Sequence, residues 1–144
     1  GMAVYGKNNV RVQNENVVCD VEFLAPQGLK FEQTNVYDPM PWPNYDAHEW
    51  HLSAETKNKK EDMEFVAVYD IRKNSKTRAC KSELEKIDSG YAVRIFINDG
   101  EVTALLPVND KAVLEANGLR SKGAVKVRYN KADGGEYILS ADSE

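Results

Sequence analysis

Two histidines and a group of aromatic residues are the side chains whose types and spacing could bind a metal ion or a ligand. His48 and His51 lie in the segment HEWHL, which is one residue shorter than the zinc-binding pattern HExxH. That pattern needs its histidines at positions i and i+4 of one helical face. On a strand, His48 and His51 would point to opposite faces. We therefore predict neither a metal site nor a cofactor.

The aromatic residues between positions 37 and 50 could instead bind a carbohydrate. The group consists of Trp42, Tyr45, His48 and Trp50, with Tyr37 beside them. Aromatic rings cover the apolar face of a pyranose while polar groups take its hydroxyls, and Arg72 or Arg94 could pair with an acidic sugar. The alternative, which we favour, is structural. In it, Trp50 belongs to the core and the proline-rich loop at 36–46 packs over a sheet edge.

Patterns for covalent or acid–base catalysis are not found in the sequence. There is no GxSxG motif for a nucleophilic serine, and neither Cys19 nor Cys80 sits in a recognisable catalytic setting. Carboxylates such as Asp70 and Asp99 fall at expected strand ends and turns, where Asp is common for conformational reasons. Glycines occur in turn pairs and not in phosphate-binding loops. We expect no catalytic residue.

Composition and charge narrow the classes of partner. The chain has 144 residues, of which 42% are hydrophobic and 29% charged, as in a soluble globular domain. Its 19 basic and 23 acidic residues give a net charge of −4. Without a basic stripe this argues against nucleic acid, and it disfavours polyanionic glycans unless a local basic patch attracts them. No apolar run approaches the roughly 20 residues of a membrane span.

The two cysteines and the N-terminus leave alternatives open. Cys19 and Cys80 could close a loop of roughly 60 residues by a disulfide, but the apolar surroundings of Cys19 favour two unpaired thiols. The first residues lack the apolar stretch of a signal peptide. Gly1 before Met2 resembles a tag remnant, so the native chain could begin further upstream.

Alternating apolar and polar residues predict a succession of short antiparallel strands. In residues 16–24, Val17, Cys19 and Val21 share one face. Residues 46–56 and 63–71 are interpreted as the two strands of one hairpin, and residues 110–117, followed by Gly118, as a short helix. Further strands are expected at 81–87, 91–98, 101–108, 124–129 and 136–139.

These elements predict an all-β fold, either an antiparallel β-sandwich or a two-layer β-sheet with one short helix. Residues 1–15 are expected to form an N-terminal arm or edge strand, and residues 16–141 a single domain.

The order of several segments resembles the C-terminal β-domain of heparinase II/III-like polysaccharide lyases. In that family a W-x-L strand precedes an F-x-x-V strand, and the resemblance covers about residues 17–108. The segments are VEFLAP at 21–26, the proline-rich stretch at 36–46, EWHLSA at 49–54, EFVAVYDI at 64–71, GYAVRIFIN at 90–98 and VTALLP at 102–107.

The resemblance implies a non-catalytic accessory domain of a secreted bacterial lyase that acts by β-elimination. Its partners would be the upstream catalytic domains of the same polypeptide, which carry the catalytic residues, and an acidic polysaccharide in the channel. A periplasmic or extracellular location would permit a Cys19–Cys80 bond. Such a domain should expose an apolar patch where the missing domains dock. The alternatives are a free-standing carbohydrate-binding module, which would use the aromatic platform, and a small independent enzyme.

Overall fold

The computed structural model describes residues 3–36, 50–58, 61–77 and 80–141. Over these residues every strand pairing is antiparallel and there is no helix, so the predicted all-β class is confirmed. The chain divides into two compact units, residues 1–77 and 78–144. The single domain expected over 16–141 stays a prediction.

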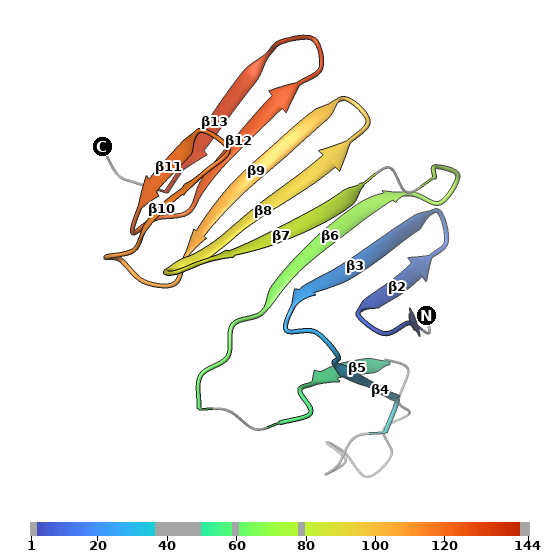
Figure 1. Ribbon diagram of the computed structural model, residues 1–144. Helices are drawn as coiled ribbons and strands as arrows, with labels where there is room; N and C mark the ends of the chain where they lie inside the picture. The colour runs from blue at the N-terminus through green and yellow to red at the C-terminus, as the bar shows by residue number, and fades with distance from the viewer. Residues whose placement is uncertain (1–2, 37–49, 59–60, 78–79, 142–144) are drawn as a thin grey trace. The chain divides into compact units, whose positions relative to one another are not determined.

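The N-terminal unit is built on a four-stranded sheet in the order β1-β2-β3-β6 (Figure 1). Residues 1–15, expected to be an arm or edge strand, contribute the outermost strand and its neighbour. The strands are β1 (Ala3–Tyr5), β2 (Asn9–Asn14), β3 (Val17–Ala25) and β6 (Val66–Lys73).

The predicted hairpin over 46–71 is wrong. β5 (His51–Glu55) pairs with β4 (Lys30–Thr34) in a separate two-stranded sheet, and β6 pairs with β3. The pairing of β4 with β5 places Phe31 opposite Ala54, and both side chains reach an apolar cluster. The short, mostly polar sequence KFEQT gives no strong strand signal, so β4 is missed by sequence reasoning.

That apolar cluster joins the β4–β5 sheet to one face of the four-stranded sheet. It consists of the buried residues Val10, Val21, Leu29 and Phe31. The Phe31 ring lies 5.6 Å from that of Phe23 and 5.8 Å from that of Tyr5, measured between centroids. Val21 on β3 pairs with Val10 on β2, and both are buried in this cluster, which confirms the apolar face predicted for residues 16–24. The unit is therefore two-layered where β4 and β5 lie.

The C-terminal unit is built on a five-stranded sheet in the order β13-β12-β9-β8-β7. Each strand matches a predicted segment within two residues at either end, because the alternation of apolar residues is regular here. The strands are β7 (Lys81–Ile87), β8 (Gly90–Ile97), β9 (Gly100–Pro107), β12 (Lys126–Lys131) and β13 (Glu136–Ser140).

The predicted helix over 110–117 is also wrong, because this segment belongs to a hairpin. β10 (Val113–Ala116) and β11 (Leu119–Lys122) are joined by Asn117 and Gly118 with φ angles of 52° and 71°. Positive φ at both central residues is what a two-residue hairpin turn of type I′ requires, and Asn-Gly is a preferred sequence for it. Asn-Gly is thus a turn here and not the end of a helix.

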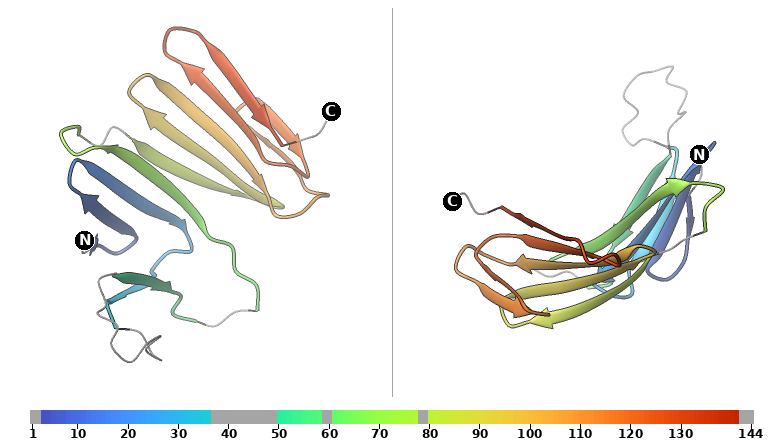
Figure 2. Two further views of the ribbon diagram at one scale, coloured as in Figure 1. Left: turned by 180° about the vertical axis from the view of Figure 1, so that it is seen from behind. Right: turned by 90° about the horizontal axis from the view of Figure 1, so that it is seen from above.

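The β10–β11 hairpin covers part of one face of the five-stranded sheet, as Figures 1 and 2 show from different sides. Leu114 and Leu119 point from the hairpin into a cluster with Ala92 and Leu105. Leu105 and Leu114 are fully buried. The C-terminal unit therefore also has a second layer, formed by two strands.

Candidate functional site

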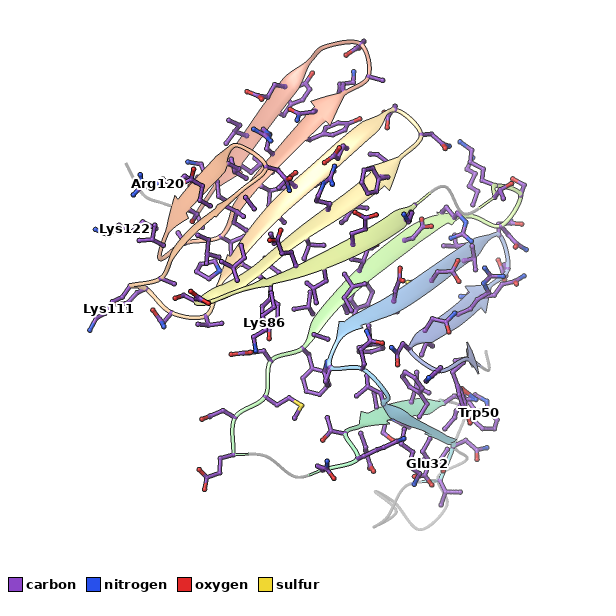
Figure 3. All side chains as sticks on the ribbon, in the orientation of Figure 1. Glu32, Trp50, Lys86, Lys111, Arg120 and Lys122 are labelled. Carbon is purple, nitrogen blue, oxygen red and sulfur yellow. The ribbon has the colours of Figure 1, made fainter. Side chains whose placement is uncertain are left out.

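The predicted aromatic platform is only partly within the described residues. Trp42, Tyr45 and His48 lie outside them. Trp50 directly precedes β5 beside the β4–β5 sheet (Figure 3) and is 41% exposed. The favoured interpretation, in which Trp50 is a core residue, is therefore wrong. Arg72, the fifth predicted site residue, lies on β6 of the four-stranded sheet.

Arg72 is held by two carboxylates. Its Nη2 donates to Asp20 Oδ2 at 2.6 Å and its Nη1 to Asp70 Oδ2 at 2.9 Å, while Nε donates to the carbonyl of Lys76 at 3.1 Å. Arg11 completes the network with two hydrogen bonds to Asp20, from Nε at 2.7 Å and from Nη2 at 3.0 Å. The donors of Arg72 are thus engaged inside the protein.

The electrostatics of this network keep Asp20 ionised. Hydrogen bonds from Arg11, and after them from Arg72, lower the pKa of Asp20 to about 2 against the opposing effect of burial. The side chain of Asp20 is almost fully buried, so its charge needs both partners. A carboxylate held in this way cannot donate a proton at neutral pH. The network therefore joins neighbouring strands, and a role of Arg72 in binding a sugar stays a prediction.

One half of the apolar face of the four-stranded sheet lies outside the cluster that β4 and β5 cover. We call it the uncovered face and define it by Val12, Val17, Tyr69 and Ile71. The register places Ile71 and Val12 on either side of Cys19, and Tyr69 next to Val21. Tyr69 and Ile71 are 63% and 68% exposed. The sequence predicted this apolar pattern, but not which part of it stays open.

In the C-terminal unit, Arg94 is the centre of a second ion network. Its Nε lies 2.8 Å from Glu101 and its Nη1 3.8 Å from Glu83, and its guanidinium stacks 4.8 Å from the centroid of Phe96. The hydrogen bond from Arg94 lowers the pKa of Glu101, and the same bond raises the pKa of Arg94. Arg94, which we also considered for acidic sugars, is therefore paired as well.

Each unit has a small cavity lined by residues that the structure describes. The first, of about 270 Å³, is lined by Pro26, Gln27, Gly28, Thr56, Lys57, Asn58 and Met63. The second, of about 170 Å³, is lined by Glu83, Leu84, Glu85, Ala92, Arg94 and Asn117. Both are smaller than the roughly 300–1,000 Å³ of ordinary ligand sites. Glu83 in the second is paired with Lys81 and Arg94.

Three exposed basic side chains lie on or beside the β10–β11 hairpin. Arg120 and Lys122 alternate along β11 with the buried Leu119 and Ser121, and Lys111 lies in the turn before β10. All three are exposed, and Figure 3 shows them along one border of the unit. Sequence reasoning missed them because it placed Lys111 in a helix at 110–117 and predicted no strand over 119–122, although the alternation there is a signal for a half-buried strand.

The cysteines are two free thiols, as the sequence favoured. The pKa of Cys19 is raised, chiefly by burial. Within the described ranges, no group of three or more His, Cys, Asp or Glu side chains is placed to hold a metal ion. Nor does the described part of the chain contain a helix long and apolar enough to cross a membrane.

The N-terminal unit therefore contains a buried ion network and an uncovered apolar face, and the C-terminal unit contains a basic hairpin border. Comparison of the chain with family models, with curated proteins and with solved structures finds no match in any of the three.

Proposed function

We propose that this chain is a non-catalytic accessory β-domain of a secreted polysaccharide lyase of the heparinase II/III-like type. In this proposal it packs against the upstream catalytic domains of the same polypeptide, in the periplasm or outside a bacterial cell. The observation that carries the proposal is the uncovered face, where Tyr69 and Ile71 stand exposed side by side with Val12 and Val17 across the sheet.

A contiguous apolar face is unfavourable in water and therefore indicates a contact surface. Single exposed apolar residues are ordinary, whereas monomers seldom leave a large apolar patch open unless it has a partner. Each square ångström of apolar surface removed from water stabilises a complex by about 25 cal/mol. Tyr69 and Ile71 are the most exposed residues of the uncovered face, so they would lose the most apolar surface to a partner and contribute most to binding.

The ionisable groups support a role without catalysis. A general acid that works near neutral pH needs a raised pKa, but the pKa values of Asp20 and Glu101 are lowered by arginine partners. Both carboxylates are engaged in hydrogen bonds that connect neighbouring strands. This favours structural charge networks over a reaction centre.

The docking role predicts that the uncovered face binds the polypeptide encoded directly upstream in the same reading frame. With that polypeptide expressed separately, we expect the chain to bind it. Replacing Tyr69→Lys together with Ile71→Lys should weaken binding at least tenfold, because two charges would have to be desolvated. Titration calorimetry measures the affinities.

The matched control is Val36→Lys. Val36 is 66% exposed in the same unit but lies outside the sheet, so this variant should bind as the unchanged chain does. Equal affinities for the double variant and the unchanged chain would refute the docking role. A signal peptide encoded immediately before residue 1 would refute the lyase parent.

A second candidate function, a carbohydrate-binding module, is favoured by the exposed ring of Trp50. On an affinity gel containing an acidic polysaccharide, the chain should then be retarded, and Trp50→Ala or Trp42→Ala should abolish most of the retardation. Phe65→Ala is the control, because Phe65 is 51% exposed in the same unit and lies outside the aromatic group. Retention that is unchanged by the tryptophan variants would contradict this function.

A further inference from the structure

β13 is the last strand in the order of the five-stranded sheet, and all five of its residues are exposed. Figure 1 shows it at the border of the sheet, beside β12. Tyr137, Ile138 and Leu139 form its middle, and Leu139 is 73% exposed. Proteins usually protect such edges with lysine, proline or a bulge, because the unpaired backbone groups otherwise bind another strand. β13 contains neither lysine nor proline, and its register with β12 is regular.

We propose that β13 pairs antiparallel with β13 of a second copy of this chain, about a two-fold axis at Ile138. Ile138 then faces Ile138 of the second copy, and Tyr137 faces Leu139. This is the one symmetric register that pairs all five residues of Glu136–Ser140. A register centred on Glu136 would place two like charges opposite each other, which is destabilising.

The apolar side chains continue across this junction. Tyr137 faces Tyr129 on β12, with ring centroids 6.1 Å apart and planes inclined by 22°, and Leu139 faces Val127. In the joined sheet these cross-strand pairs line up on one face. Tyr129 and Tyr137 of one copy are followed by Leu139 and Val127 of the second copy. The two-fold axis repeats this line of apolar side chains, so it occurs once on each side of Ile138.

Charge complementarity selects a second copy as the occupant. Ser140 is the cross-strand neighbour of Lys126, so the proposed register places Glu136 opposite Ser140 of the second copy, with Lys126 of that copy on the next strand. Because serine is small, the carboxylate and the ammonium group can approach each other over it. The axis produces this pair twice, with opposite charges in both cases.

The pairing would join two five-stranded sheets into one continuous sheet through an isologous contact. Its contact area is limited to a short strand, so we expect a weak dimer whose population depends on concentration. The inference uses only the C-terminal unit and is independent of the uncovered face and of the proposed lyase parent.

Sedimentation equilibrium of the full chain tests the proposal. The apparent mass should rise with concentration from 16.2 kDa towards twice that value. Ile138→Lys and Ile138→Glu should each stay monomeric, because like charges would meet at the axis. An equimolar mixture of the two variants should dimerise again, since lysine then faces glutamate. Val113→Lys, at a 46% exposed position on β10, is the control and should dimerise normally.

Circular dichroism verifies that each variant is folded. If the charged variants unfold, amide hydrogen exchange of the unchanged chain provides the second measurement, and exchange in β13 should slow at high concentration. A chain that stays monomeric throughout would overturn the proposal, as would charged variants that dimerise alone or a mixture that stays monomeric. Exchange in β13 that is independent of concentration would overturn it as well.

Discussion

Asp20 lies on β3 between two strands that each supply an arginine. Arg11 reaches it from β2 and Arg72 from β6, so one carboxylate joins three neighbouring strands. A buried charge is tolerated only when it is paired and hydrogen-bonded, and removal of one partner of a buried pair is costly. This network is therefore a part of the fold whose effect on stability can be measured.

Asp20 should make the folded state sensitive to acid. Its folded-state pKa, about 2, is below the ordinary value of 3.8. A lowered pKa contributes stability that is present above pH 3.8 and lost as pH falls from there towards 2. Asp20→Asn should lower the free energy of unfolding by about 1–3 kcal/mol at neutral pH, because charge-assisted hydrogen bonds are lost.

Urea unfolding at several pH values measures both effects. The asparagine variant should show a shallower loss of stability between pH 3.8 and 2. Glu32→Gln is the control, because Glu32 forms an exposed ion pair with Lys30 at 3.8 Å and exposed pairs are worth little. An unchanged acid dependence in the Asp20 variant would contradict the assignment.

The sequence could predict which face of β3 is apolar, but not the partners of Asp20. Alternation along residues 16–24 is a local signal, and the structure confirms it. Arg72 and Asp20 are 52 positions apart, and no local pattern reports a contact over that distance. The sequence therefore could not show that Arg72 donates to Asp20 and Asp70.

At the scale of elements, two glycines decide how the β10–β11 hairpin turns and closes. Gly118 and Gly123 both have positive φ angles, of 71° and 69°. A Cβ at Gly118 would meet only Arg128 Nη1, at 3.8 Å, whereas a Cβ at Gly123 would overlap the backbone carbonyl of Asp110. A residue with a Cβ would therefore be strained in its backbone at both positions, but only Gly118 has room for the Cβ itself.

We therefore expect Gly118→Ala and Gly123→Ala to differ in stability. Gly118→Ala should cost about 1 kcal/mol, the usual cost of a left-handed conformation for a residue with a Cβ. Gly123→Ala should cost about 2 kcal/mol or more, because backbone atoms must also move. Thermal unfolding measures the difference, and equal costs would mean that space at Gly123 does not matter.

The misread elements share a physical cause. In residues 110–117 an N-terminal Asp and a following Gly fit helix signals, but burial alternates with a period of two, and the Asn-Gly turn favours a hairpin. Likewise the sequence shows that residues 51–55 can form a strand, but not that β4 is their partner. The strand segments of the five-stranded sheet could be predicted because they are sequential, regular and joined by short turns.

At the scale of the whole molecule, the two units have the same arrangement of sheets, but the order in which the chain forms their strands differs. Each has one larger sheet and a two-stranded sheet over part of one face. In the C-terminal unit the larger sheet follows chain order apart from the inserted β10–β11 hairpin. In the N-terminal unit, β3 pairs with β6 only after the chain has passed through β4 and β5.

The inserted β4–β5 segment has a consequence for how the chain acquires its structure. Ala25 and Val66 are paired neighbours, so the loop between them must close before β3 and β6 can align, and closing a long loop costs entropy. Pairings between sequence neighbours, such as β7 with β8 and β8 with β9, do not carry this cost and form sooner. The meander at the end of the chain should thus assemble first, and Tyr69 and Ile71 should join their sheet last.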